Sequence, residues 1–359
     1  MPSLTDVAKI AGVGVMSVSR VVNGTRKVSP ETERKVRAAI ERIGYEPNEA
    51  ARVLKGQRSH VLGLIFPDLA DPFFAICANA VQEAARLAGY VTWIAVTGHR
   101  EEIEREVAKV MVQRNVAGMV VVPCGKQNDH FANVVKRGIP IVSIDKPLEN
   151  VEAASLVVDN RAAAAKATEH LIEHGHRSIL CITDDFPIFT RIERIAGYSQ
   201  AMRRAKLQVQ VCPVGSMSGN LSDQLDFALS SATPPTAIFV GSDLIALYTL
   251  HELQRRSLSL PDEIALIAFD DFDAATLVQP AITVIRQPVA ELGRKATELL
   301  CHQIDHPESI NVGRVTLKTE FVIRESCGCS AGVARTRPDI HDRGIRLREP
   351  LNKPANSRH

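Results

Sequence analysis

Apolar side chains in the first 45 residues recur every three to four positions, and this spacing predicts short amphipathic helices. Three are expected, at residues 4–11, 15–23 and 30–43. Ser3 followed by Asp6 resembles a capping box, and Ser29 stands directly before a proline, which suits a first helical turn. Gly12 separates the first helix from the second. The head of the chain is therefore predicted to be a small all-helical unit.

From residue 61 onward, continuous apolar runs alternate with amphipathic stretches such as 72–89 and 101–115. The runs are predicted to be buried strands, at 61–67, 90–97, 118–123 and 139–145, then in a second series at 155–160, 178–183, 236–242, 263–270 and 283–288. Strands and helices in alternation indicate parallel sheets covered on both faces. Two series predict two doubly wound α/β lobes, each with ligand-binding residues at the carboxyl ends of its strands.

Length and composition exclude some classes of protein. The chain has 359 residues, and this length is too great for one ordinary domain. Apolar residues make up 45% of it. No apolar run approaches the roughly 18 to 20 residues of a membrane span, and the N-terminus has no export signal, so we expect a cytoplasmic protein with no membrane partner. The seven cysteines lack paired spacing, which predicts free thiols, and Cys327 with Cys329 is a weak metal signal.

Charge is distributed unevenly along the chain. Residues 1–60 carry 11 Lys and Arg against 6 Asp and Glu, whereas residues 61–330 carry 25 against 32. A basic head on an acidic body predicts that the head binds a polyanion.

The second predicted helix has two distinct sides. At roughly 100° per residue, Val18 and Val22 point toward the other helices. The outward side carries Val15, Met16, Ser19, Arg20 and Asn23. A helix fits the major groove of DNA, where arginine bonds guanine and apolar side chains touch thymine methyl groups. The alternative is an ordinary solvent-facing row.

Residues 48–56 form a short stretch, NEAARVLKG, with Asn48 as a candidate N-cap. A segment of so few residues does not remain helical by itself in water. The stretch is expected to order when docked, for example in a minor groove where Leu54 parts a base step. The alternative is a plain linker.

The segments TDVAKIAGV, MSVSRVVNG and VSPETERKVRAAIERIGYEPNEAARVLKG resemble the DNA-binding head of the lactose repressor (LacI/GalR) family, and the resemblance continues to about residue 326. It implies a helix-turn-helix domain at 1–47, a hinge helix and linker at 48–59, and a two-lobed periplasmic-binding-protein-like domain for effector binding and dimerisation at 60–326. The lobes would comprise about 60–158 with 288–318, and 159–286 with 319–326. Residues 327–359 are expected to form a disordered basic tail.

The resemblance also implies residue roles. DNA contacts are expected from Val15, Met16, Ser17, Ser19, Arg20, Asn23, Ala51, Leu54 and Lys55. Gly14 departs from the serine common in the family, which removes a capping hydroxyl. Effector contacts are expected from Phe73, Phe74, Asp145, Thr190, Arg194, Ser242, Asp270 and Gln287. Two competing interpretations exist: one of Phe73 and Phe74 packs in the core, and Arg194 pairs with Glu193 or Asp185.

Two further departures bear on the effector. Ser242 replaces an asparagine common in the family, and Ile188 stands where purine-responsive members present a cation. A sugar or sugar acid is therefore favoured over a purine or nucleoside.

Other patterns are weaker. His170 and His174 have metal-ligand spacing, but the sequence near them offers no third ligand. Adjacent residues Asp270 and Asp271 point to opposite faces of a strand, so they do not form an acid/base pair. No metal, cofactor or catalytic set is expected.

The prediction that follows is a dimeric, effector-controlled transcriptional regulator, a repressor of a pseudo-palindromic operator. Leucine heptads for a tetramer are not visible. The rival classes are a solute-binding protein without DNA function, which would not need the basic head, and an enzyme on the same scaffold.

Overall fold

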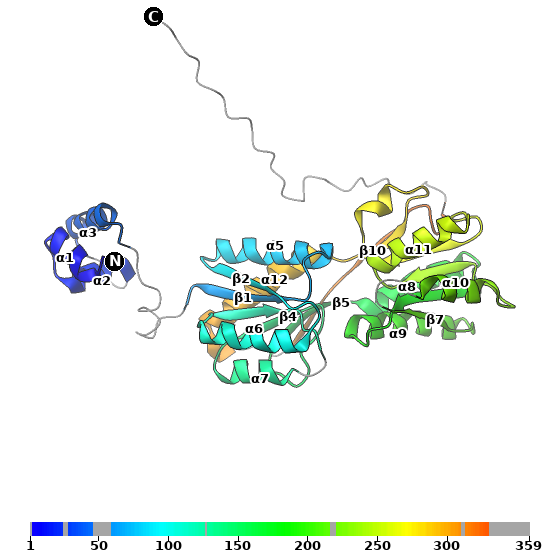
Figure 1. Cartoon of the computed structure of the whole chain (residues 1–359), viewed down its shortest axis with the longest axis horizontal. Coiled ribbons are helices and arrows are strands. Elements are labelled where there is room, and N and C mark those ends of the chain that lie inside the picture. The colour runs from blue at the N-terminus through cyan, green and yellow to red at the C-terminus, as the bar shows by residue number, and fades with distance from the viewer. Residues whose placement is uncertain are drawn as a thin grey trace, which may run out of the picture. The chain divides into compact units, whose positions relative to one another are not determined.

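The computed structural model describes residues 2–23, 28–45, 59–125, 128–215, 220–309 and 313–329 (Figure 1). The chain divides into two compact units: the first comprises residues 1–158 and 288–317, and the second comprises 159–287 and 318–359. No helix in the described ranges is both long enough and apolar enough to cross a lipid bilayer. The predicted contacts at Ala51, Leu54 and Lys55, and the tail from residue 330, lie outside the described residues.

Three helices form the head: α1 (Leu4–Ala11), α2 (Val15–Asn23) and α3 (Pro30–Ile43). Their bounds match the prediction because the signals that end them are local. The Ser3 hydroxyl accepts a hydrogen bond from the Asp6 amide, and the Asp6 carboxylate accepts one from the Ser3 amide. Gly12 ends α1 in the left-handed region, with φ of 65°, where glycine is favoured. Val7, Val18 and other buried side chains form the small core of the head.

The first unit contains a six-stranded parallel sheet in the order β11-β5-β4-β3-β1-β2. Its strands are β1 (Val61–Phe66), β2 (Val91–Val96), β3 (Gly118–Val121), β4 (Ile141–Ile144), β5 (Ala154–Val158) and β11 (Arg314–Leu317). Its helices are α5 (Pro72–Leu87), α6 (Glu101–Gln113), α7 (Asp129–Lys136) and α12 (Val289–Asp305), followed by the short η3 (Pro307–Ser309). Helices α5 and α12 cover one face of the sheet and α6 and α7 cover the other (Figure 1).

One prediction for this sheet is wrong: β2 is not a buried strand. It lies at the edge of the sheet and exposes Val91 by 63% and Trp93 by 43%, together with Ile94 and Val96. Its apolar composition is that of a central strand, and composition alone does not specify which strand occupies the edge. Strand β5 belongs to this sheet, in agreement with the lobe bounds of 60–158, although its apolar run was counted in the second series.

The second unit contains a sheet in the order β12-β10-β9-β8-β6-β7, in which β12 alone runs antiparallel. Its strands are β6 (Ile179–Asp184), β7 (Gln210–Val214), β8 (Ala237–Val240), β9 (Ala265–Phe269), β10 (Thr283–Arg286) and β12 (Glu320–Val322). Helices α8 (Asn160–Glu173) and α9 (Phe189–Arg204) cover one face. Helices α10 (Leu221–Leu229) and α11 (Asp243–Arg255), with η2 (Asp273–Thr276), cover the other.

Three strands escaped prediction. Strand β7 contains a proline, and β11 and β12 are four and three residues long. Segments this short and this polar do not produce an apolar run, so their pairing depends on the sheet that receives them.

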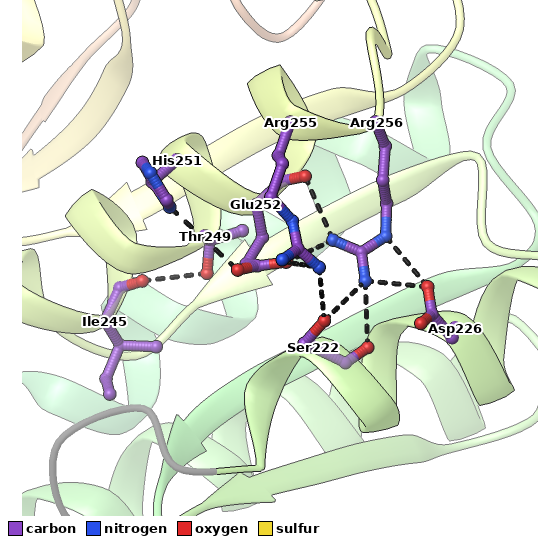
Figure 2. A network of polar contacts seen from close by, with 8 residues as sticks. All are labelled: Ser222, Asp226, Ile245, Thr249, His251, Glu252, Arg255 and Arg256. Carbon is purple, nitrogen blue, oxygen red and sulfur yellow. Dashed lines mark hydrogen bonds and ion pairs between the residues drawn. The ribbon is translucent and has the colours of Figure 1, made fainter.

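Arg256 links α10 to α11 on the surface of the second unit (Figure 2). Its guanidinium donates hydrogen bonds to the Asp226 carboxylate at 2.6 and 2.9 Å, to the Ser222 hydroxyl at 3.0 Å, and to Glu252. The Arg256 side chain is only 14% exposed. This network therefore adds polar contacts between α10 and α11 to the apolar contacts that both helices make with the core.

The chain passes between units at residues 158/159, 287/288 and 317/318. Asp159 accepts hydrogen bonds from the backbone and hydroxyl of Thr319, both at 2.9 Å, and Lys318 Nζ lies 3.1 Å from its second oxygen. Two of the three passages are thus tied together. Cys327 is fully buried and Cys329 packs against the same core, so the packed core extends beyond the predicted start of the tail at 327.

Candidate DNA-binding and effector sites

Helix α2 exposes the side that the helical spacing predicts. Met16 is 71% exposed and Val15 44%, whereas Val18 is fully buried in the core of the head. Ser17, Ser19 and Arg20 are half-buried. The helix begins at the Gly14 carbonyl, which accepts hydrogen bonds from the amides of Ser17 and Val18 without any capping side chain. The outward side of α2 therefore presents two apolar side chains, Val15 and Met16, together with the cationic side chain of Arg20.

Arg194 is the centre of a buried polar cluster in the second unit. It projects from α9, where its Nε donates to the Asn160 side-chain oxygen at 2.8 Å and its Nη1 donates to the Gly241 carbonyl at 2.6 Å. The same Nη1 lies 3.3 Å from an Asp270 carboxylate oxygen. Its guanidinium carbon lies 3.7 Å from the centre of the Phe269 ring, a cation–π contact. Arg194 therefore does not pair with Glu193, which binds Arg161 instead.

Asp270 and Gln287 complete this cluster from two adjacent strands. Asp270 follows β9 with φ of 73°, and Gln287 follows β10, which pairs in parallel with β9. The Gln287 amide donates a hydrogen bond to Asp270. Gln287 is buried, with only 7% of its surface exposed, and its amide oxygen has no hydrogen-bond partner among the described residues. A buried acceptor left unsatisfied costs free energy unless a ligand supplies a donor.

Asp271 belongs to a different set of contacts. Arg286 and Arg324 both bond its carboxylate, at 2.7 to 3.0 Å. The two adjacent aspartates thus point to different partners, as the alternation of strand side chains predicts. Only Asp270 shares a cluster with predicted effector residues.

Thr190 and Ser242 lie at the starts of α9 and α11. Thr190 is buried and Ser242 half-buried. Within the described structure, neither side chain hydrogen-bonds to Arg194, Asp270 or Gln287. The structure therefore brings together three of the predicted residues of the second unit and leaves two beside helix N-termini.

The predicted residues of the first unit are Phe73, Phe74 and Asp145. Phe74 is 7% exposed and belongs to the main core, while Phe73 is half-buried and meets it edge-on at 5.2 Å between ring centres. Asp145 follows β4 in the left-handed region, with φ of 69°. Its neighbour Lys146 is buried and donates to the Pro123 carbonyl at 3.1 Å.

Three residues near the Arg194 cluster were missed in the sequence. Asn160 begins α8, two residues after the last residue of β5, and binds Arg194; the end of that strand was the available signal. Asp184 ends β6, and burial raises the pKa of its carboxyl, while the charges of Arg191 and Arg194 oppose that rise. The Nε of Arg191 is buried without a hydrogen-bond partner in the described structure. Perturbed and unsatisfied groups at strand ends are typical of ligand sites.

A helical head with an exposed recognition row, followed by two α/β units of which the second has a buried polar cluster at its strand ends, is typical of a ligand-responsive DNA-binding regulator. Comparison with known proteins agrees. The signature described as "Bacterial regulatory proteins, lacI family" matches residues 3–48, and that of the "Periplasmic binding protein-like domain" matches residues 168–327.

Relatives span nearly the whole chain. The transcriptional repressor PurR of Vibrio campbellii is 31% identical over 91% of this chain and 98% of its own. A lac repressor dimer bound to operator and the anti-inducer ONPF superposes with a TM-score of 0.79 at 23% identity, covering 91% and 99% of the two chains. The CelR regulator in complex with cellobiose gives a TM-score of 0.67 at 28% identity, covering 91% and 100%. The chain belongs to the LacI family of transcriptional regulators.

Proposed function

We propose that this regulator is an operator-specific repressor whose DNA affinity is controlled by a sugar or sugar acid bound at Arg194, Asp270 and Gln287. Its relatives are transcriptional regulators, and we infer that this chain catalyses no reaction and acts in the cytoplasm, where its DNA lies. The observation that carries the effector proposal is the buried Arg194 cluster with its unsatisfied Gln287 oxygen.

The chemistry of the cluster suits hydroxyl groups. Asp270 accepts hydrogen bonds and Arg194 donates them with charge assistance, while the free Gln287 oxygen accepts one more. A polyhydroxylated ring presents donors and acceptors side by side, and it leaves few buried polar atoms of the cluster unpaired. The cellobiose bound by CelR, a relative at 28% identity, has this chemistry.

The DNA-binding proposal rests on α2. Met16 and Val15 are exposed and can touch thymine methyl groups, and Arg20 can bond guanine in the major groove. We propose that Ser17, Ser19 and Asn23 position the helix on the DNA, with Ala51, Leu54 and Lys55 in the minor groove.

The homodimer proposal rests on the edge strand β2. Its exposed Val91, Trp93, Ile94 and Val96 form an apolar strip along a sheet edge with which no other described strand pairs. Exposed edges of this kind attract another chain unless they are covered. A second copy of the chain would cover the strip and bring two heads to the two halves of a pseudo-palindrome.

The test is a fluorescence anisotropy titration of a duplex from the region upstream of the gene, repeated with sugars, sugar acids and nucleobases. At least one sugar or sugar acid should shift the affinity. Asp270→Ala should bind the duplex like the wild type and lose the shift, while the exposed carboxylate variant Asp262→Ala should keep it. Responsiveness retained in Asp270→Ala, or confined to nucleobases, would overturn the effector proposal.

A further inference from the structure

The last turn of α8 and the turn that follows β12 meet at three potential metal ligands. His170 lies in the last turn of α8 and His174, one turn further on, is the C-cap of that helix, and Cys329 reaches them from the turn after β12. The Cys329 sulfur lies 3.5 Å from Nε2 of His170 and 3.1 Å from Nε2 of His174. The third ligand that the local sequence lacks thus comes from a residue 155 positions away. We propose that these three side chains form a binding site for Zn²⁺.

The separations fit one ion. Zinc bonds imidazole nitrogen at about 2.0–2.1 Å and thiolate sulfur at about 2.3 Å in a tetrahedral arrangement, which places neighbouring ligand atoms about 3.5 Å apart. All three ligand atoms here lie within 4.8 Å of one another. Two imidazoles with one thiolate form a donor set of intermediate softness, which suits zinc and disfavours magnesium or calcium.

The hydrogen bonding of His174 prepares it to coordinate. Its Nδ1 lies 2.8 Å from the His170 carbonyl oxygen, and because that oxygen only accepts, Nδ1 carries the proton. The lone pair is then on Nε2, the atom that faces Cys329. Backbone carbonyls commonly orient metal-binding histidines in this way. The His170 ring is buried and meets Phe321 edge-on at 5.1 Å between ring centres, which restricts its rotation.

The turn that carries Cys329 is equally constrained. Cys327 is fully buried, and its sulfur lies 3.2 Å from the Thr283 hydroxyl. Gly328 has φ of 89°, a left-handed conformation that favours glycine. Cys329, half-buried, is therefore presented from an anchored turn. Three protein ligands leave a fourth position for water or another group, and the bound ion would fasten the C-terminal turn to α8.

The chain supplies a matched control. His302 and His306 also lie one turn apart at the end of a helix, with ring centres 4.8 Å apart, but they belong to no three-ligand group among the described residues. His306→Ala therefore removes a histidine from a similarly spaced pair that lacks a third metal ligand among the described residues.

The experiment titrates Zn²⁺ and Co²⁺ into the reduced full-length protein, by calorimetry and by absorption spectroscopy respectively. The expected result is one tight equivalent, with a thiolate-to-cobalt charge-transfer band and a raised unfolding temperature with zinc. Cys329→Ser and Cys329→Ala should each abolish the band. His174→Ala removes a direct ligand and should weaken binding by more than about a hundredfold, beyond the roughly ten- to hundredfold losses that outer-shell changes cause.

His306→Ala should retain both the band and the affinity, and circular dichroism should show that every variant is folded. Absence of binding by the wild type would overturn the proposal. So would a cobalt complex without the thiolate band, or binding that His306→Ala impairs as much as His174→Ala does.

Discussion

At the scale of single residues, Arg194 carries several contacts at once. It bonds Asn160, the Gly241 carbonyl and Asp270 while stacking on Phe269. Lysine keeps the charge but lacks the planar fork, so Arg194→Lys leaves buried acceptors unpaired. We expect a loss of about 2 kcal/mol in unfolding free energy, as for hydrogen bonds to charged groups, together with loss of the effector response.

Urea unfolding and the anisotropy assay measure these two effects separately. Arg161→Lys is the control, because Arg161 makes a two-pronged contact with Glu193 at the surface of the same unit. An unchanged stability in Arg194→Lys would contradict the assigned contacts.

Arg194, Asp270 and Gln287 could be predicted as candidates from the sequence because strand ends and the family pattern both point to them, and the structure places the three side chains in contact. It did not find their partners. Asn160 and the Gly241 carbonyl bind Arg194 across 34 and 47 residues of chain, and such pairings depend on the folded sheet order. The approach of Cys329 to His174 escaped prediction for the same reason.

At the scale of elements, the Arg256 network predicts a pH-dependent stability. The hydrogen bond from Arg256 lowers the pKa of Glu252 in the folded protein. A lowered carboxyl pKa stabilises the fold above the ordinary glutamate pKa of about 4.3, and this stabilisation is lost as the pH falls through the lower folded value. Arg256→Met should therefore cost about 2 kcal/mol at pH 7, and its difference from the wild type should shrink below about pH 4.

Urea unfolding monitored at both pH values tests this expectation. Arg86→Met is the control, because Arg86 pairs with Glu83 on an exposed surface where such pairs contribute little. A difference between Arg256→Met and the wild type that does not change with pH would exclude Glu252 as the titrating partner.

The edge strand β2 gives a second prediction at this scale. Trp93→Arg places a cation in the exposed apolar strip and should dissociate the dimer, which sedimentation velocity would detect. Phe227→Arg is the matched control, because Phe227 is an exposed aromatic side chain of the second unit, 80% exposed on α10. Dissociation by Phe227→Arg and not by Trp93→Arg would place the dimer interface elsewhere.

Helix bounds in the head were predicted correctly because caps and glycines act over a few residues, as Ser3 and Gly12 illustrate. The exposure of β2 was not predicted, because a strand of the same composition can occupy the centre or the edge of a sheet, depending on the order of the other strands.

The whole molecule combines a DNA-binding head with an effector-binding body. Thr319 donates two hydrogen bonds to Asp159, which joins two of the three passages between the units. Effector control requires that the effector bind the DNA-competent and DNA-incompetent arrangements with different affinity, and a few kcal/mol of difference suffices to switch operator occupancy.

Within the head, Arg20→Ala should weaken operator binding by about 1–3 kcal/mol, the range for one arginine–guanine contact, and leave the fold intact. Arg37→Ala is the control, because Arg37 is exposed and paired with Glu33 on α3. Anisotropy on the operator duplex measures both, and equal losses in the two variants would remove Arg20 from base recognition.

The most direct test of the central claim compares the affinity of the wild-type protein for the upstream duplex and for a scrambled duplex of the same length and composition, at physiological salt. Specific recognition by α2 predicts binding to the upstream duplex about a thousandfold or more tighter than to the scrambled one. Equal affinity for the two duplexes, with and without any effector that binds the protein, would contradict the account.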